Sequence, residues 1–182
     1  MTPAEVLLIG GRAGVGKTTV AWEVSALLRE AAVAHAVVDG DFMGEVHPAP
    51  PGDPDRSEIT ERNLAAVWAN FARLGYRRLV YTNTASVLPS EAGLFARALG
   101  PDVRTTRVLL TATDATTRER LMRREIGSGL ERELAGSARS ARHLDEHTSA
   151  EVIRIPTDGR SVASIARDVV TGWIPGLTYV DG

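Results

Sequence analysis

The chain has 182 residues, of which 43% are hydrophobic and 24% are charged, and its formal net charge is -2. This length and composition predict a single domain over residues 1–182 with an ordinary soluble surface. The small net charge gives no indication of a polyanion partner, and the absence of cysteine excludes disulfides and cysteine-bound metals. The apolar run 6–9 is too short for a signal-peptide core or a membrane span. We therefore expect a cytoplasmic protein with no membrane or nucleic-acid partner.

The first part of the chain alternates strand, helix and strand. A short buried strand is predicted over 6–9, where apolar residues precede two glycines. Apolar residues then recur on one face of a helix that reaches Ala31. A second buried strand is predicted over 34–38, and it stops at Asp-Gly-Asp. The proline-rich segment 45–56 must be a loop.

The middle of the chain continues this alternation. A helix with one apolar side follows the loop, and we expect Asp55 and Glu58 to cap its start and Gly75 to end it. A third strand is predicted over 77–83. A short helix over 89–99 begins with proline, as first turns often do.

A fourth strand over 107–113 leads into two consecutive helices. Asp114 is predicted to cap the first, which is strongly basic and is broken by the sequence Gly-Ser-Gly. Ser128 and Glu131 form a capping box for the second, which carries a periodic apolar face.

The last part of the chain is a fifth strand over 150–156 and a helix capped by Ser161. Strands that alternate with helices indicate an α/β fold, with a parallel sheet covered by helices on both faces. Ligands of such sheets bind at the carboxyl ends of the strands.

A phosphate-binding loop follows the first predicted strand. Residues 11–18, GRAGVGKT, match G-x-x-x-x-G-K-[ST] in full. The glycines let the backbone form a nest of N–H groups, and the start of the following helix adds positive charge. A chance glycine-rich turn would not need the strand before it and the periodic helix after it. The residues predicted to bind the nucleotide are Gly11, Ala13, Gly14, Val15, Gly16, Lys17, Thr18 and Thr19.

Lys17 is the only lysine among 21 basic residues, and the arginine excess elsewhere fits a codon bias of the source genome. A compact ammonium on a flexible stem can sit inside a tight loop and touch several phosphate oxygens, whereas a guanidinium is too bulky. We therefore predict that Lys17 reaches the β- and γ-phosphates, and that Thr18 offers its hydroxyl to Mg²⁺.

Two aspartates, Asp39 and Asp41, follow the second strand. Side chains two residues apart on a strand share a side, so both carboxylates are predicted to face the phosphate cleft. One would hold Mg²⁺ together with Thr18, and the other would accept a proton from an attacking hydroxyl. The alternative is a simple turn signal with one aspartate exposed. No acidic residue follows the third strand, which ends in Thr82, Asn83 and Thr84.

The basic helix is a candidate lid. Phosphoryl transfer spreads negative charge over the transferring group, and a mobile arginine arm can close over it and exclude water. The alternative is a solvated face in which Glu119 and Glu125 pair with some of the arginines. Nucleic-acid binding ranks low, because the run has no interleaved aromatic residues. The arginines of this helix are Arg118, Arg120, Arg123 and Arg124.

These motifs together resemble the small P-loop kinases that close an arginine-bearing lid over ATP. The segments that carry the resemblance are GGRAGVGKTT, DGDFMGEVHP, TTRERLMRREIGSG and PTDGRSV. Asp-Gly-Asp is similar to adenylylsulfate kinase, Gly-Asp-Phe followed by His-Pro is similar to gluconate kinase, and the overall plan is similar to chloramphenicol-type phosphotransferases.

The resemblance implies a three-layer P-loop NTPase fold with a five-stranded parallel sheet and a helical lid at about 115–135. It also implies ATP and Mg²⁺, Asp41 as acceptor base or metal contact, and Arg120, Arg123 or Arg124 as the lid arginine. Adenylylsulfate kinase usually has asparagine where Phe42 stands, so the acceptor does not carry over.

Two functions from different classes follow. The first is an ATP-dependent kinase that transfers the γ-phosphate to a hydroxyl of a small-molecule acceptor. The second is a nucleotide-binding switch or regulatory ATPase that acts on a protein partner, which the missing acidic residue after the third strand keeps open. The paired aspartates and the arginine helix favour the kinase.

Overall fold

The computed structural model describes residues 3–124 and 129–177. Its centre is a five-stranded sheet of order β2-β3-β1-β4-β5 in which every pairing is parallel. The predicted five-stranded parallel sheet is confirmed. The strands are β1 (Glu5–Gly10), β2 (Ala36–Asp39), β3 (Arg78–Thr82), β4 (Arg104–Thr111) and β5 (Ile153–Pro156).

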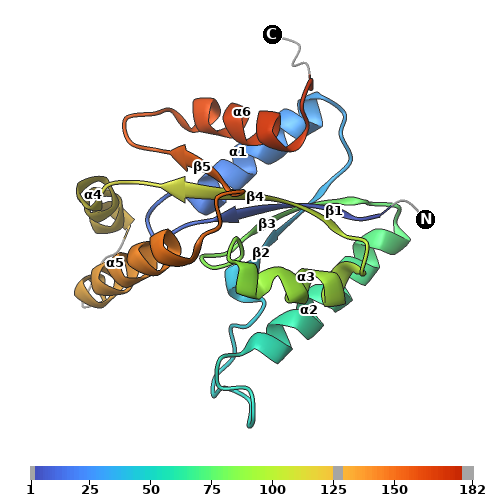
Figure 1. Ribbon diagram of the computed structural model, residues 1–182, viewed down its shortest axis with the longest axis horizontal. Coiled ribbons are helices and arrows are strands. Elements are labelled where there is room, and N and C mark those ends of the chain that lie inside the picture. The colour runs from blue at the N-terminus through green and yellow to red at the C-terminus, as the bar shows by residue number, and fades with distance from the viewer. Residues whose placement is uncertain (1–2, 125–128, 178–182) are drawn as a thin grey trace.

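Helices cover both faces of the sheet, which gives the predicted three layers (Figure 1). α1 (Lys17–Glu30) and α6 (Val162–Trp173) pack together on one face, and α2 (Ser57–Arg73) and α3 (Ala92–Leu99) cover the other. The strand period of two explains this division. Val6 and Leu8 of β1 belong to the core on the α2 side, whereas Leu7 and Ile9 belong to the core on the α1 side.

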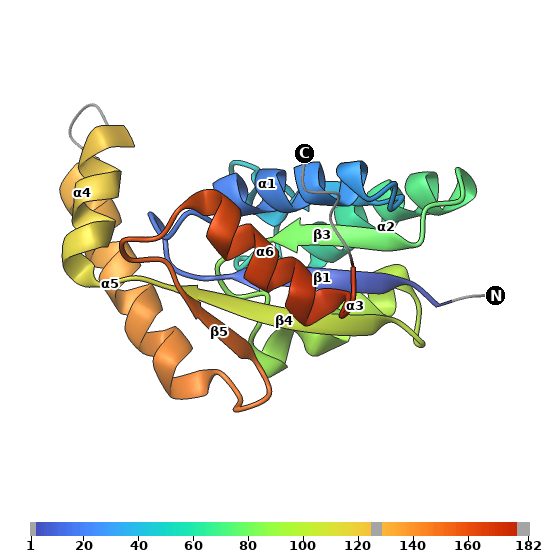
Figure 2. The same ribbon diagram turned by 90° about the horizontal axis from the view of Figure 1, so that it is seen from above.

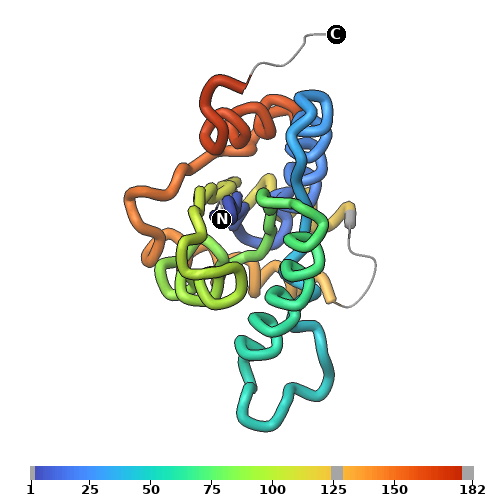
Figure 3. Tube along the Cα trace, turned by 90° about the vertical axis from the view of Figure 1, so that its right-hand side faces the viewer, coloured from blue at the N-terminus to red at the C-terminus, as the bar shows by residue number. Residues whose placement is uncertain are grey.

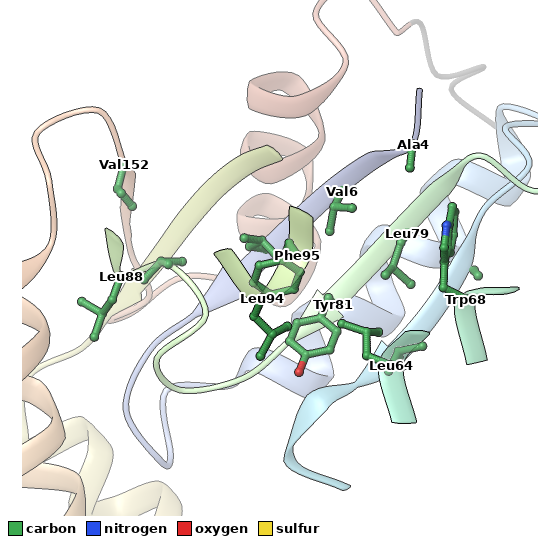
Figure 4. Packing of buried hydrophobic residues seen from close by; sticks show 14 of the residues in the cluster. Ala4, Val6, Leu64, Trp68, Leu79, Tyr81, Leu88, Leu94, Phe95 and Val152 are labelled. Carbon is green, nitrogen blue, oxygen red and sulfur yellow. The ribbon is translucent and has the colours of Figure 1, made fainter. Parts of the chain in front are cut away.

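The core beneath α2 and α3 is built around β3 (Figure 4). Leu79 and Tyr81 of this strand are buried against Leu64 and Trp68 of α2. The ring of Tyr81 meets that of Phe95 from α3 edge-on, with centroids 5.2 Å apart. These contacts fix the orientation of Tyr81, which matters for the site described below.

Two further helices, α4 (Asp114–Arg124) and α5 (Leu130–His147), stand beyond the carboxyl end of β4 (Figure 2). They occupy the place of the predicted lid. The far end of α5 reaches back to the sheet and buries Leu144 in the core. The loop between β2 and α2 extends away from the body of the domain (Figure 3).

Two predicted helix caps are wrong. At the start of α2 the residue before the helix is Arg56, in a left-handed conformation with φ 58°, and Asp55 makes no cap. Asp53 takes that role, since its Oδ2 accepts from the Ile59 N–H at 3.0 Å. At α4 the Oγ1 of Thr113 accepts from the Thr116 N–H at 3.3 Å, while Asp114 pairs with an arginine of the phosphate-binding loop.

The other predicted helix ends have mixed outcomes. Ser161 caps α6, because its Oγ accepts from the Ser164 N–H at 3.2 Å. Gly75 follows α2 with φ 94°, as predicted. The capping box of Ser128 lies outside the described residues. None of the described helices is both long and apolar enough to cross a lipid bilayer.

Candidate active site

The phosphate-binding loop leaves the carboxyl end of β1 and runs directly into α1, whose first residue is Lys17. The Gly11 N–H donates to the Thr84 carbonyl at 3.2 Å, so the loop is also tied to the segment after β3. The first N–H groups of α1 have no partner within the helix, and its dipole is positive at this end. The loop therefore presents N–H groups and positive potential suited to phosphate oxygens.

Lys17 lies inside this loop and is 8% exposed. Its Nζ donates to the Gly11 carbonyl at 2.9 Å and lies 3.4 Å from the Arg12 carbonyl and 3.5 Å from the Thr84 hydroxyl. The loop thus curls around the ammonium group. A compact setting of this kind was predicted from the presence of lysine at this position alone. Lys17 also lines the cavity described below.

Thr18 and Asp39 meet at the mouth of the loop. The Thr18 hydroxyl donates to Asp39 Oδ2 at 3.0 Å, which joins the start of α1 to the end of β2. Asp39 Oδ1 accepts from the Asp41 N–H at 3.2 Å. Asp39 therefore supplies a carboxylate beside the phosphate-binding loop, although no acidic residue follows β3.

Asp41 reaches the same cavity by a different route from the one predicted. It stands in a short 3-10 helix, Gly40–Phe42, and not on the strand, so strand alternation does not place it. Its carboxylate Oδ1 accepts from the amide of Asn83 at 2.9 Å. Both aspartates line the cavity, together with the phosphate-binding loop.

These oxygen donors fit Mg²⁺. Magnesium prefers oxygen ligands, keeps several waters, and usually takes only one or two protein carboxylates in addition to substrate phosphates. A hydroxyl and a carboxylate 3.0 Å apart, with a second carboxylate two residues on, match that requirement. Among the described residues there is no group of three or more His, Asp or Glu that would hold a metal unaided.

Of the predicted lid arginines, Arg120 is placed at the cavity. Its Nη1 donates to the Val15 carbonyl at 3.1 Å and to the Thr157 hydroxyl at 3.0 Å, and its Nη2 donates to the Thr157 carbonyl at 3.1 Å. It bridges the phosphate-binding loop and the segment after β5. Three hydrogen bonds hold this guanidinium at the edge of the cavity, which differs from the predicted mobile arm.

Arg123 is placed elsewhere. It forms an ion pair with Glu119 one turn away, its side chain is 76% exposed, and it does not line the cavity. For this residue the solvated-face alternative describes the structure better than the predicted lid role. The side chain of Arg124 lies outside the described part of the chain.

The segment after β5, whose sequence PTDGRSV contributes to the kinase resemblance, forms another wall of the cavity. Thr157 and Arg160 line the cavity, and Asp158 fixes the segment by accepting from the N–H and hydroxyl of Thr113. Hydrogen bonds from the Thr116 and Thr113 hydroxyls, in that order, lower the pKa of Asp158 to about 2. Arg160 donates to Asp168 of α6 at 2.7 Å, so its guanidinium is held in place.

The cavity enclosed by these elements has a volume of about 650 Å³. Its lining also includes four residues for which no role in the site was predicted. Phe42 and Glu45 belong to the segment DGDFMGEVHP, Thr84 follows β3, and Glu133 lies on α5. Phe42 is 71% exposed, which leaves an aromatic ring beside the proposed base.

Tyr81 packs against the short 3-10 helix Gly40–Phe42, called the Asp41 turn from here on. A Cβ built on Gly40 would lie 2.2 Å from the Tyr81 Oη and Cζ atoms, so the ring packs directly against this turn. Burial raises the pKa of the Tyr81 phenol, and the charges of Asp41, Glu91 and Asp39 raise it further. The phenol is therefore neutral at physiological pH and acts as a packing surface for the turn.

Comparison with solved structures identifies the fold. The Deinococcus radiodurans tunicamycin resistance protein aligns with a TM-score of 0.63 and 20% identity, over 96% of this chain and 97% of its own. A Sinorhizobium meliloti gluconokinase aligns at 0.59 and 19%, over 94% and 91%. The Mycobacterium tuberculosis APS kinase in complex with AMPPNP and APS aligns at 0.55 and 20%, over 94% and 98%.

The chain has the fold of the small P-loop kinases. The alignments run over more than nine-tenths of this chain and of each matched structure, so the likeness concerns the domain as a whole. No model of a protein family and no curated protein sequence matches the chain.

Proposed function

We propose that the protein is an ATP- and Mg²⁺-dependent kinase that transfers the γ-phosphate to a hydroxyl group of a small molecule. The observation that carries this proposal is the position of Asp41. Its carboxylate lines the same cavity as Lys17 and Thr18, and Asn83 holds it there at 2.9 Å. A phosphate site with a carboxylate base beside it meets the two requirements of phosphoryl transfer to an alcohol.

The roles divide along the cavity. The loop 11–16 and the start of α1 bind the phosphates, and Lys17 places its charge on the β- and γ-phosphates. Arg120 stabilises the negative charge that spreads over the transferring group. Thr18 and Asp39 would hold Mg²⁺, which when bound neutralises charge on the β- and γ-phosphate oxygens.

In the transfer step, the acceptor hydroxyl gives its proton to the Asp41 carboxylate as its oxygen bonds to the γ-phosphorus. The bond between the γ-phosphorus and the β–γ bridging oxygen breaks, and ADP leaves. Asn83 orients the carboxylate toward the cavity by donating to its Oδ1.

The alternative function, a nucleotide switch acting on a protein partner, loses its main support. It was kept open because no acidic residue follows the third strand. Asp39, hydrogen-bonded to the Thr18 hydroxyl at 3.0 Å, offers a carboxylate beside the phosphate-binding loop from β2 instead. No contact among the described residues favours the switch.

An acceptor screen tests the proposal directly. The protein is incubated with γ-labelled ATP, Mg²⁺ and fractionated metabolite extracts, and labelled small molecules are resolved by chromatography. We expect label in an acceptor other than water. Tight nucleotide binding without transfer across broad extracts would instead favour the switch.

The roles of the two aspartates are separated by measuring transfer against Mg²⁺ concentration. Asp41→Asn keeps the size of the side chain but cannot take the proton, so we expect transfer to collapse at every Mg²⁺ concentration while nucleotide affinity survives. Asp39→Asn weakens a metal contact, so we expect a smaller loss that high Mg²⁺ restores by mass action. The reverse pattern would exchange the two roles, and full activity of Asp41→Asn would remove it from the mechanism.

A further inference from the structure

Four consecutive residues of the phosphate-binding loop contact the lid helices. They do so through the Arg12 side chain, the Ala13 carbonyl, the Gly14 backbone and the Val15 carbonyl. The partners belong to α4 and α5, which lie more than 100 residues further along the chain. The lid helices are therefore attached to the loop itself.

Arg12 is the centre of this attachment. Its side chain is only 7% exposed, although arginine is rarely buried. Its Nε donates to the Ser137 hydroxyl of α5 at 2.8 Å, and its Nη1 forms an ion pair with Asp114 at the start of α4. One guanidinium thus joins both lid helices to the loop, which uses the fork of donors that lysine does not have.

Ser137 also binds the backbone of the phosphate-binding loop. It is 2% exposed, and while it accepts from Arg12 its hydroxyl donates to the Ala13 carbonyl at 2.9 Å. In a trans peptide the C=O and N–H groups point in opposite directions. Holding the Ala13 carbonyl toward α5 therefore turns the Gly14 N–H away from α5.

The Val15 carbonyl is held in the same way by Arg120 of α4, which turns the Gly16 N–H away from that helix. Between these two peptides, Gly14 has φ 82° and lies against α4. A Cβ there would come within 2.9 Å of Leu121 and 3.0 Å of Thr117, both of which are fully buried. At Gly14 the backbone of the loop thus packs closely against α4.

We propose that Arg12 and Ser137 are positioning residues that set the direction of the phosphate-binding N–H groups and couple nucleotide binding to the placement of α5. The inference rests on the proposed function, because it assumes that phosphates occupy the loop. Phosphate oxygens that pull on the Gly14 N–H strengthen the hydrogen bond on the other side of the same peptide, from Ser137. Nucleotide binding then tightens α5 against the loop.

The test needs no acceptor. Affinity for the non-hydrolysable analogue AMPPNP with Mg²⁺ is measured by calorimetry, and hydrogen exchange of the α5 amides is measured with and without the analogue. In the wild type we expect the analogue to slow exchange in α5. In Ser137→Ala and in Arg12→Met we expect the Kd to rise about three- to tenfold, as for the loss of one or two buried hydrogen bonds, and the slowing in α5 to be lost.

Matched controls on the same helix are Ser140→Ala and Arg142→Met, which should bind and exchange like the wild type. Arg12 acts on the loop through Ser137. The Kd of the double variant Arg12→Met/Ser137→Ala for AMPPNP should therefore be no higher than the higher of the two single-variant Kd values. Independent structural defects would add instead. If Arg12→Met does not fold, Asp114→Asn removes one partner of Arg12 at a side chain that is 83% exposed, and the same loss of slowing in α5 is expected.

Wild-type affinity and α5 exchange in both Ser137→Ala and Arg12→Met would overturn this inference alone. An additive double variant would do the same. A wild-type protein that does not bind the analogue at all would overturn the proposed function together with it.

Discussion

Gly40 offers a sharp test of how the fold positions Asp41. A Cβ at this position would lie 2.2 Å from the Cζ and Oη atoms of Tyr81, which is 1.2 Å short of the 3.4 Å at which ordinary contact begins. The ring is 2% exposed and is held edge-on by Phe95, so it has no room to retreat. In Gly40→Ala we therefore expect the Asp41 turn to move by about 1 Å.

A misplacement of this size at a reacting group costs about a hundredfold in rate. The phosphate-binding loop lies outside this contact, so nucleotide affinity should change by less than about threefold. Transfer to the acceptor found in the screen is the assay, with the slow hydrolysis of ATP as a second measure of the same base. The control is Gly136→Ala on α5, where the nearest atom to a new Cβ is 3.9 Å away and the helix should gain about 0.5–1 kcal/mol. Normal transfer by a folded Gly40→Ala protein would refute the claim that Tyr81 sets the position of Asp41, and so would an equal loss of nucleotide affinity.

Three other predictions concern the loop, the lid and the segment after β5. Lys17→Arg should lose activity nearly as completely as Lys17→Ala, because the loop carbonyls leave no room for a guanidinium; near-normal ATP turnover would show that shape does not matter there. Arg120→Ala should lower turnover on the order of a hundredfold with a smaller effect on nucleotide binding, whereas Arg123→Ala should cost less than about twofold, and equal losses in kinetic assays would contradict this assignment. Because hydrogen bonds from Thr116 and Thr113 lower the folded pKa of Asp158 from 3.8 to about 2, its charge stabilises the folded state above about pH 4, and this contribution is lost as pH falls toward 2. The Asp158 side chain is partly exposed to solvent, so Asp158→Asn should reduce the free energy of unfolding at pH 7 by less than about 1 kcal/mol, with the difference shrinking as urea unfolding is repeated at lower pH.

The fold was predictable because its signals are local. The strands appear as short apolar runs, the helices as periodic apolar faces, and the phosphate-binding loop as a fixed spacing. The errors occur at helix starts, where several acceptors compete within a few residues. Asp53 caps α2 where Asp55 was expected, and Thr113 caps α4 where Asp114 was expected, because Asp114 has a stronger partner in Arg12. No local pattern contains that partner, which lies 102 residues away.

The candidate site was predictable only where it coincides with a motif. Lys17, Thr18 and Asp39 follow from the spacing of the motif and the end of β2, whereas Asp41 reaches the cavity through the short 3-10 helix after that strand. The part of the cavity wall formed by Thr84 and Glu133 does not follow from the sequence, because one residue follows β3, the other lies on α5, and only the tertiary fold brings them together. Among four neighbouring arginines the sequence could not separate Arg120 from Arg123, since the difference depends on what each one faces across the fold.

In a chain this rich in arginine, residue type alone does not show which arginine belongs to the site, and the phosphate-binding loop is an example. The chain has 20 arginines and one lysine, and the loop and the first residue of α1 contain one of each, five positions apart. At position 17 the Nζ atom lies 2.9 and 3.4 Å from two carbonyl oxygens of the loop, and so small a site suits an ammonium group. At position 12 two partners on different helices must be reached at once, which suits the two arms of a guanidinium. Lys17 is conspicuous in the sequence and Arg12 is not. Both side chains are nevertheless buried, and both are held by hydrogen bonds to or from the loop and its neighbours. Burial of a charged side chain in a functional loop is therefore the signal that identifies Arg12, and only the folded structure supplies it.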